Sequence, residues 1–215
     1  MFDKQDYKTW IFDCDGVILD SNPIKTKAFY EVGLPYGKEY AMQLEAYHQE
    51  FGGISRFDKF RYFFKDILKK QEYSEELSRA LNRYAELVSD KLLQCKETDG
   101  ARTLFDNIPS YTRKIVVSGS LETELRQVFA QRKLERHFDA IYGSPQTKMA
   151  ILQREKDQGR LGFPSVFIGD SRYDYECAQA FKIDFIFVAR YTEFNAWKDY
   201  FDGKEVRVVS TLVEI

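Results

Sequence analysis

Two aspartates separated by a single residue give the clearest chemical signal in the sequence. Asp13 and Asp15 directly follow the apolar segment Thr9–Phe12, and Gly16 comes next. Side chains two positions apart on an extended chain point to the same side, so the two carboxylates share one side of the strand end. Two acids crowded beside apolar residues need a cation or a proton to balance their charge. The spacing therefore indicates a metal or acid–base site.

The same short string is also typical of a capping turn or of part of a calcium loop. A calcium loop places further acidic ligands close downstream and ends on a glutamate. Here Val17, Ile18 and Leu19 follow Gly16 instead, which excludes the calcium loop.

A second acidic pair, Asp170 and Asp174, follows the apolar segment Ser165–Ile168 and Gly169. Taken alone, the pair is equally typical of a helix N-cap and a surface acid, because acidic side chains favour the first turn of a helix. Together with Asp13 and Asp15 it supplies three or four oxygen ligands, which favour a hard cation. Mg²⁺ fits best, since it binds few carboxylates and completes its shell with water and substrate phosphate.

Two further polar positions have types that suit a phosphoryl group. Ser118 and Gly119 follow the apolar segment Lys114–Val117, and a hydroxyl with free backbone N–H groups at a helix start binds phosphoryl oxygens. An ordinary capping box over Ser120–Thr123 is the alternative. Lys148 stands at a predicted helix start, where a cation is electrostatically unfavourable, which indicates a function. A metal ion and a lysine together would balance the charge of a transferred phosphoryl group.

The elements that position these residues alternate between short apolar strands and amphipathic helices after Asp99–Gly100. This alternation predicts an α/β fold with a Rossmann-like parallel sheet and helices on both faces. Ligands of such sheets gather beyond the carboxyl ends of the strands, where the polar residues above are expected. The predicted strands span residues 9–12, 114–117, 140–143, 165–168 and 185–188, and a final apolar run follows at 206–209. The predicted helices begin near residues 101, 121, 148 and 175.

The stretch between the first two strands has a different character. Apolar residues recur there at helical spacing, and glycines and a proline interrupt the pattern near residues 33–37 and 52–53. We therefore expect an inserted all-helical cap domain over residues 22–97, with the catalytic core formed by residues 1–21 and 98–215.

Composition excludes several classes of protein. The net charge is -2, from 32 basic and 34 acidic residues, and no basic stripe indicates nucleic-acid binding. Three widely spaced cysteines do not form a disulfide framework or a zinc site, and Cys14 is expected to be inert packing. No segment reaches the roughly 18 apolar residues of a membrane helix. These patterns predict a cytoplasmic protein that has no membrane partner and is a monomer or homodimer.

Taken in order, the four polar clusters resemble the motifs of the haloacid dehalogenase-like hydrolase superfamily, in its phosphoglycolate phosphatase and beta-phosphoglucomutase-like branch with a helical cap. The matching positions are Asp13-Cys14-Asp15-Gly16-Val17, Ser118, Lys148 and Gly169-Asp170-Ser171-Arg172-Tyr173-Asp174. The resemblance extends over the whole core. Met149 replaces a common proline, and Tyr175, Phe181 and Lys182 are bulkier than usual, which leaves the subfamily open.

The resemblance implies a role for each residue. Asp13 would attack phosphorus and form an aspartyl-phosphate, and Asp15 would act first as acid and then as base. Ser118 and Gly119 would bind the phosphoryl group, and Lys148 would neutralise it and steady Asp13. The other roles concern Mg²⁺: its ligands would be Asp13, Asp170 and the backbone carbonyl of Asp15, with Asp174 acting as a further ligand through water or orienting Lys148.

The second acid indicates phosphate esters as substrates, because relatives that act on carbon or on phosphonates lack it. The segment 52–58 resembles the specificity loop of beta-phosphoglucomutase, so Arg56 would bind a distal anion of the substrate. A surface arginine paired with Asp58 or Asp66 is the alternative. Asn22, Lys25 and His48 are weaker candidates for the cleft between cap and core.

We therefore expect a Mg²⁺-dependent phosphatase acting on a small phosphorylated metabolite, such as a sugar phosphate. A sugar phosphate mutase is the alternative, and a catalytically inactive regulatory module is a third reading.

Overall fold

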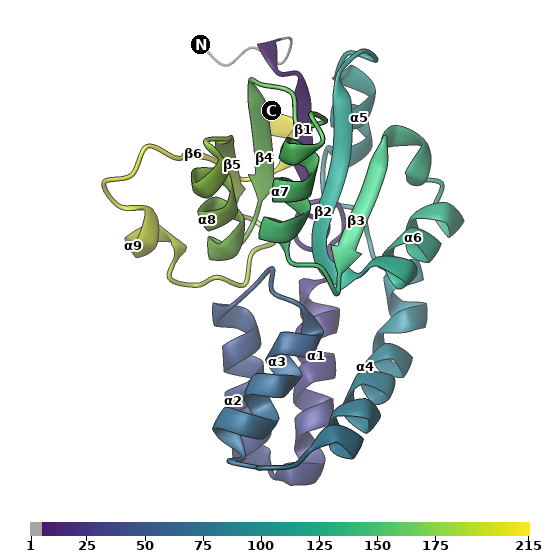
Figure 1. The fold of residues 1–215 in the computed structure, drawn as a ribbon, viewed down its shortest axis with the longest axis vertical. Helices are drawn as coiled ribbons and strands as arrows, with labels where there is room; N and C mark the ends of the chain where they lie inside the picture. The colour runs from purple at the N-terminus through teal and green to yellow at the C-terminus, as the bar shows by residue number, and fades with distance from the viewer. Residues whose placement is uncertain (1–5) are drawn as a thin grey trace.

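A six-stranded parallel sheet forms the centre of the core in the computed structural model, which describes residues 6–215. The strand order is β3-β2-β1-β4-β5-β6, and each neighbouring pair is parallel (Figure 1). The strands are β1 (Thr9–Phe12), β2 (Arg113–Leu121), β3 (Ala140–Ser144), β4 (Ser165–Gly169), β5 (Asp184–Val188) and β6 (Arg207–Val209). The predicted α/β Rossmann-like fold is confirmed.

Both faces of the sheet are covered, as alternate side chains of β1 show. Trp10 and Phe12 point to one face, where they belong to the cluster that includes Phe105 of α5 and Phe129 of α6. Ile11 points to the other face, toward α7 and α8. The core helices are α5 (Ala101–Asn107), α6 (Glu122–Gln131), α7 (Lys148–Asp157), α8 (Arg172–Phe181) and α9 (Trp197–Phe201), with short turns η4 (Glu135–His137) and η5 (Leu212–Glu214).

The chain reverses its direction of travel across the sheet at β1. From β1 it passes to β2 and β3 on one side, and it then crosses to β4, β5 and β6 on the other side. Such a switch point leaves a crevice beyond the carboxyl ends of the two strands beside it. Asp13 follows β1 and Asp170 follows β4, so both lie at this crevice.

The helices between β1 and α5 lie together at the carboxyl edge of the sheet (Figure 1). They are α1 (Asn22–Gly33), α2 (Lys38–Glu50), α3 (Arg56–Tyr62) and α4 (Ser74–Gln94), with the turns η2 (Leu34–Tyr36) and η3 (Phe63–Ile67). Residues at helical spacing on α4, from Ala80 through Tyr84 and Val88 to Leu92, are buried against this group. We call this group the cap. The domain boundaries at residues 22 and 97 stay a prediction.

Two details differ from the elements expected from the sequence. Strand β2 continues to Leu121 instead of ending at Val117, with a register shift against β3 between Val117 and Leu121. The short helix α9 was not predicted. Among residues 6–215, no helix combines the length and the hydropathy that a bilayer span requires.

Candidate active site

Lys148 lies between two buried carboxylates at the carboxyl edge of the sheet. Its Nζ is 2.9 Å from Asp13 Oδ1 and 2.5 Å from Asp174 Oδ1. Asp13 follows β1, Lys148 begins α7 and Asp174 lies in the first turn of α8. All three side chains are almost completely buried. The fold thus joins residues from three separate motifs into one charged cluster.

Burial shapes the ionisation of this cluster. It opposes the charge on Lys148, but Asp13 and Asp174 outweigh it and hold the pKa of Lys148 above its ordinary value. Burial also raises the pKa of Asp13, because the attraction of Lys148 offsets only part of the desolvation. The pKa of Asp170 is raised by burial and then by the negative charges of Asp13 and Asp174. The cluster therefore lacks positive charge.

The arrangement of the acids fits a small cation that would supply this charge. Asp13, Asp170 and Asp174 each place one carboxylate oxygen within 4.8 Å of the others. Asn22 Nδ2 donates to Asp170 Oδ2 at 2.7 Å and fixes its orientation. The loop at Gly16 approaches Asp170 so closely that a Cβ there would stand 2.1 Å from its Oδ2. Oxygen ligands in this number are typical of Mg²⁺ sites.

Asp174 makes two kinds of contact, one with each carboxylate oxygen. Ser171 is the N-cap of α8, and Ser171 Oγ donates to Asp174 Oδ2 at 2.7 Å within a capping box. The other oxygen, Oδ1, accepts from Lys148 Nζ. The alternative of Asp170 as N-cap and Asp174 as a surface acid is therefore wrong. Both oxygens of Asp174 have protein partners, which favours the role of orienting Lys148.

Asp15 is held by groups from both the core and the cap. Lys25 Nζ of α1 donates to Asp15 Oδ2 at 2.5 Å, and Ser120 Oγ donates to the same oxygen at 2.9 Å. Ser21 Oγ donates to Oδ1 at 2.6 Å. Burial opposes ionisation of Asp15, but these donors hold its pKa below the ordinary value. These contacts therefore favour the ionised form of Asp15.

The segment after the regular part of β2 faces the same crevice. Ser118 is fully buried, and its Oγ accepts from Ser120 N at 3.1 Å. Helix α6 begins at Glu122 with Leu121 as N-cap and has no side-chain cap, so the expected alternative of a capping box at Ser120 is wrong. Ser120 instead contacts Asp15 and Lys25.

A cap loop closes over the core at two glycines. A Cβ on Gly119 would stand 2.4 Å from the carbonyl oxygen of Gly53. Gly53 itself has a positive φ of 80°, and a Cβ there would stand 2.8 Å from Ser171 Oγ. Side chains at either position would separate the two surfaces. The loop after α2 therefore covers the end of the site formed by Gly119 and Ser171.

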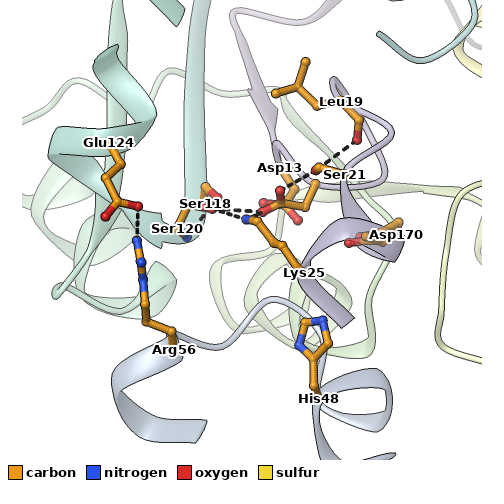
Figure 2. A network of polar contacts seen from close by, with 12 residues as sticks. Asp13, Leu19, Ser21, Lys25, His48, Arg56, Ser118, Ser120, Glu124 and Asp170 are labelled. Carbon is orange, nitrogen blue, oxygen red and sulfur yellow. Dashed lines mark hydrogen bonds and ion pairs between the residues drawn. The ribbon is translucent and has the colours of Figure 1, made fainter. Parts of the chain in front are cut away.

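Arg56 lies at the opposite end of the cavity from Asp170 (Figure 2). It is 7% exposed, forms an ion pair with Glu124 of α6 and stands 5.0 Å from the Tyr84 ring centroid. The alternative of a surface arginine paired with Asp58 or Asp66 is therefore wrong. Asp58 pairs with Arg61 instead.

Sequence reasoning did not single out several charged residues that line the same cavity: Lys59, Glu124 and Glu193. Lys25 and His48 were only weak candidates, and both line it too. Arg56 and Lys59 are three residues apart on one helix, so their shared face was available as a signal. No such local signal exists for Glu124 or Glu193, because their partners lie far away in the sequence.

Comparison with known families agrees with this geometry. Residues 10–188 match the family model described as haloacid dehalogenase-like hydrolase. A curated relative, the phosphorylated carbohydrates phosphatase of Thermotoga maritima, is 26% identical over 139 residues. That alignment covers 64% of this chain and 62% of the relative, less than two thirds of its length.

Solved structures share the fold. A beta-phosphoglucomutase from Clostridium difficile is 16% identical, with a TM-score of 0.74 over 97% of this chain and 93% of that one. A predicted phosphatase from Clostridium acetobutylicum is 22% identical, with a TM-score of 0.74 and coverage of 95% and 94%. A haloacid dehalogenase-like family hydrolase from Streptococcus pneumoniae is 15% identical, with a TM-score of 0.69 and coverage of 97% and 96%.

Proposed function

The chain belongs to the haloacid dehalogenase-like hydrolase family, and on that basis we propose that it hydrolyses a small phosphomonoester through an aspartyl-phosphate on Asp13. The observation that carries this proposal is the contact of Asp13 with Lys148 beside the carboxylates of Asp170 and Asp174. A carboxylate nucleophile needs a fixed orientation and nearby positive charge, since its target is itself anionic.

In the first step, an Asp13 carboxylate oxygen attacks phosphorus while the bond to the leaving oxygen breaks. For this step Asp15, which is ionised in the free protein, must first take up a proton from solvent; it then gives that proton to the leaving oxygen, so the alcohol departs neutral. Ser118 and Gly119 bind the phosphoryl oxygens, and Lys148 balances their charge. The cap loop at Gly53 packs against Gly119 and would limit the access of bulk water to this end of the site during transfer.

In the second step, water attacks the phosphorus of the aspartyl-phosphate. Asp15 takes a proton from this water, and Asp13 is released as a carboxylate together with inorganic phosphate. The contacts of Asp15 with Lys25, Ser21 and Ser120 support this role, because they hold Asp15 in the ionised form that a base requires.

Mg²⁺ is the cofactor that we propose for this site. Asp13, Asp170 and the backbone carbonyl of Asp15 would hold it, and Asp174 would orient Lys148 beside it. When bound, it would act as a Lewis acid that offsets phosphoryl charge. The uncompensated acidic cluster supports this assignment.

A phosphorylated carbohydrate is the substrate class that we propose. The name of the Thermotoga maritima relative supports this class. The cavity supports it too, because residues of both the cap and the core line it and many of them are polar. The cytoplasmic location and the monomeric or homodimeric state stay predictions.

Phosphorus NMR of a sugar 1-phosphate incubated with the protein and Mg²⁺ tests the proposal. We expect the inorganic phosphate signal to grow in wild type and not in Asp13→Asn. Formation of an isomeric sugar 6-phosphate instead would identify a mutase. If neither product forms with any of a panel of phosphate esters, the proposed function is wrong.

A further inference from the structure

A second polar group lies in the cavity, apart from the residues that act on phosphorus. It comprises His48 of α2, Lys59 of α3 and Glu193, which follows β5. His48 is 7% exposed and Lys59 is 2% exposed. Figure 2 shows the His48 ring pointing from α2 toward the side of the site that contains Lys25 and Asp170. The phosphoryl-transfer steps above make no use of this group.

Lys59 determines which nitrogen of the His48 ring carries the proton. Lys59 Nζ is 2.6 Å from His48 Nδ1 and donates to the His48 backbone carbonyl oxygen at 3.3 Å. Burial and the charge of Lys59 hold the pKa of His48 well below its ordinary value, so the ring is neutral. With Lys59 assigned as the donor at Nδ1, the single ring proton is on Nε2.

The Nε2–H group of His48 is a buried donor without an acceptor. It makes no hydrogen bond to any residue of the described range 6–215. The nearest carboxylate oxygen, Glu193 Oε2, is 3.9 Å away, which is too far for a hydrogen bond. Buried donors are nearly always satisfied in folded proteins. A ligand that enters the cavity can supply the missing acceptor.

The charges around this donor limit what the ligand group can be. Burial lowers the pKa of Lys59 to about 7 and raises the pKa of Glu193, so this part of the cavity disfavours a fully charged ligand group. A hydroxyl group fits both neighbours, since it can accept from His48 Nε2–H and donate to Glu193. An oxygen at ordinary hydrogen-bond distance from both atoms spans their 3.9 Å separation. Thr26 Oγ1 donates to the same Glu193 oxygen and fixes its position.

We propose that His48 and Glu193 form a hydroxyl-binding subsite, which selects phosphomonoesters whose leaving group is polyhydroxylated. The proposal rests on the proposed function, because it concerns the leaving group of that reaction. Lys59 is a positioning residue for His48. A site built to bind a hydroxyl discriminates against analogues that lack it, because its own polar groups are then left unpaired.

The experiment measures kcat/KM for a hexose phosphate, for its series of monodeoxy analogues and for p-nitrophenyl phosphate. We expect wild type to prefer the parent ester over one deoxy analogue by about tenfold, the value of roughly one hydrogen bond. Two variants of His48 separate the contributions of its two nitrogens. His48→Asn keeps an acceptor for Lys59 and loses the distal donor, whereas His48→Gln restores a donor near the Nε2 position.

The proposal predicts that His48→Asn removes the preference for the hydroxyl and that His48→Gln recovers part of it. Equal losses for the parent and all deoxy esters in His48→Asn would overturn it and indicate a structural histidine with a bound water. Absence of any such preference in wild type would overturn it as well. If His48→Asn does not fold, Glu193→Ala tests the same preference. A different result would reject the proposed function itself: no release of phosphate from any ester in the panel, including p-nitrophenyl phosphate.

Discussion

Lys25 of the cap helix α1 contacts Asp15 of the core at 2.5 Å and Ser120 of β2 at 2.6 Å. A cap residue thus fixes the side chain to which we assign acid–base catalysis. Ser21, just before α1, holds the other oxygen of the same carboxylate. The position of Asp15 therefore depends on how the cap sits on the core.

Replacing Lys25 tests this dependence. We expect Lys25→Met to lower kcat by about tenfold to a hundredfold, since a misplaced acid–base group slows proton transfer. The matched control is Lys27→Met on the same helix, because the Lys27 side chain is 70% exposed and pairs with Glu31 of the same helix at 4.0 Å. Steady-state kinetics with p-nitrophenyl phosphate checks both. Equal effects of the two substitutions would contradict a positioning role for Lys25.

Removing the nucleophile gives the most direct prediction. Asp13→Asn keeps the size of the side chain but cannot form an acyl phosphate that turns over. We expect kcat to fall by at least about a thousandfold, as for other enzymes that lose their nucleophile. Circular dichroism and Tm check that the variant is folded. Hydrolysis at the wild-type rate by folded Asp13→Asn would show that another group attacks phosphorus.

The raised pKa values of the acidic cluster predict a pH-dependent response to metal. Burial raises the pKa of Asp13 to about 7 and that of Asp170 well above its ordinary value. In the metal-free protein, the contribution of these groups to the free energy of unfolding is fully present at pH values below the ordinary aspartate pKa of about 4. That contribution is lost as the pH rises through the raised values, because the folded state then binds more protons than the unfolded state.

Mg²⁺ binds the ionised carboxylates, so its stabilising effect should grow over the same pH range. We expect the rise in Tm on adding Mg²⁺ to be small near about pH 4 and larger near about pH 7. This interval lies between the ordinary and the raised pKa values of the aspartates. Differential scanning fluorimetry of wild type and Asp170→Asn checks this. The idea is wrong if the metal shifts Tm equally at all pH values or equally in both proteins.

The ion pair of Arg56 with Glu124 predicts how the enzyme treats substrates with a second anion. A distal phosphate must compete with the Glu124 carboxylate for the guanidinium group. We expect Glu124→Gln to raise the ratio of kcat/KM for a sugar bisphosphate over the monophosphate by about threefold to tenfold, and Arg56→Ala to lower it.

Arg61→Ala is the control for this pair, because Arg61 is on the same helix, is 58% exposed and pairs with Asp58. If Glu124→Gln and Arg56→Ala give the same bisphosphate-to-monophosphate ratio of kcat/KM as the control, the pair serves only to join cap to core.

The order of apolar and helical segments along the chain is enough to predict the sheet and the residues at its carboxyl edge. Apolar segments alternating with helices predict parallel strands, and parallel strands bring their ends to one edge. Each of four polar residues stands at, or a few positions after, the end of a predicted strand: Asp13, Ser118, Lys148 and Asp170. Their proximity could therefore be predicted from the order of the strands. The exact end of β2 could not, because a register shift depends on the neighbouring strand.

The polar side chains that meet across the cavity come from distant parts of the chain. Arg56 and Glu124 are 68 residues apart in the sequence, and His48 of α2 lies near Glu193, which follows β5. No local spacing encodes these contacts, since they depend on the angle at which the cap packs on the core and on side-chain rotamers. Chain order determines which strand ends meet, but partners between cap and core are determined by packing in three dimensions.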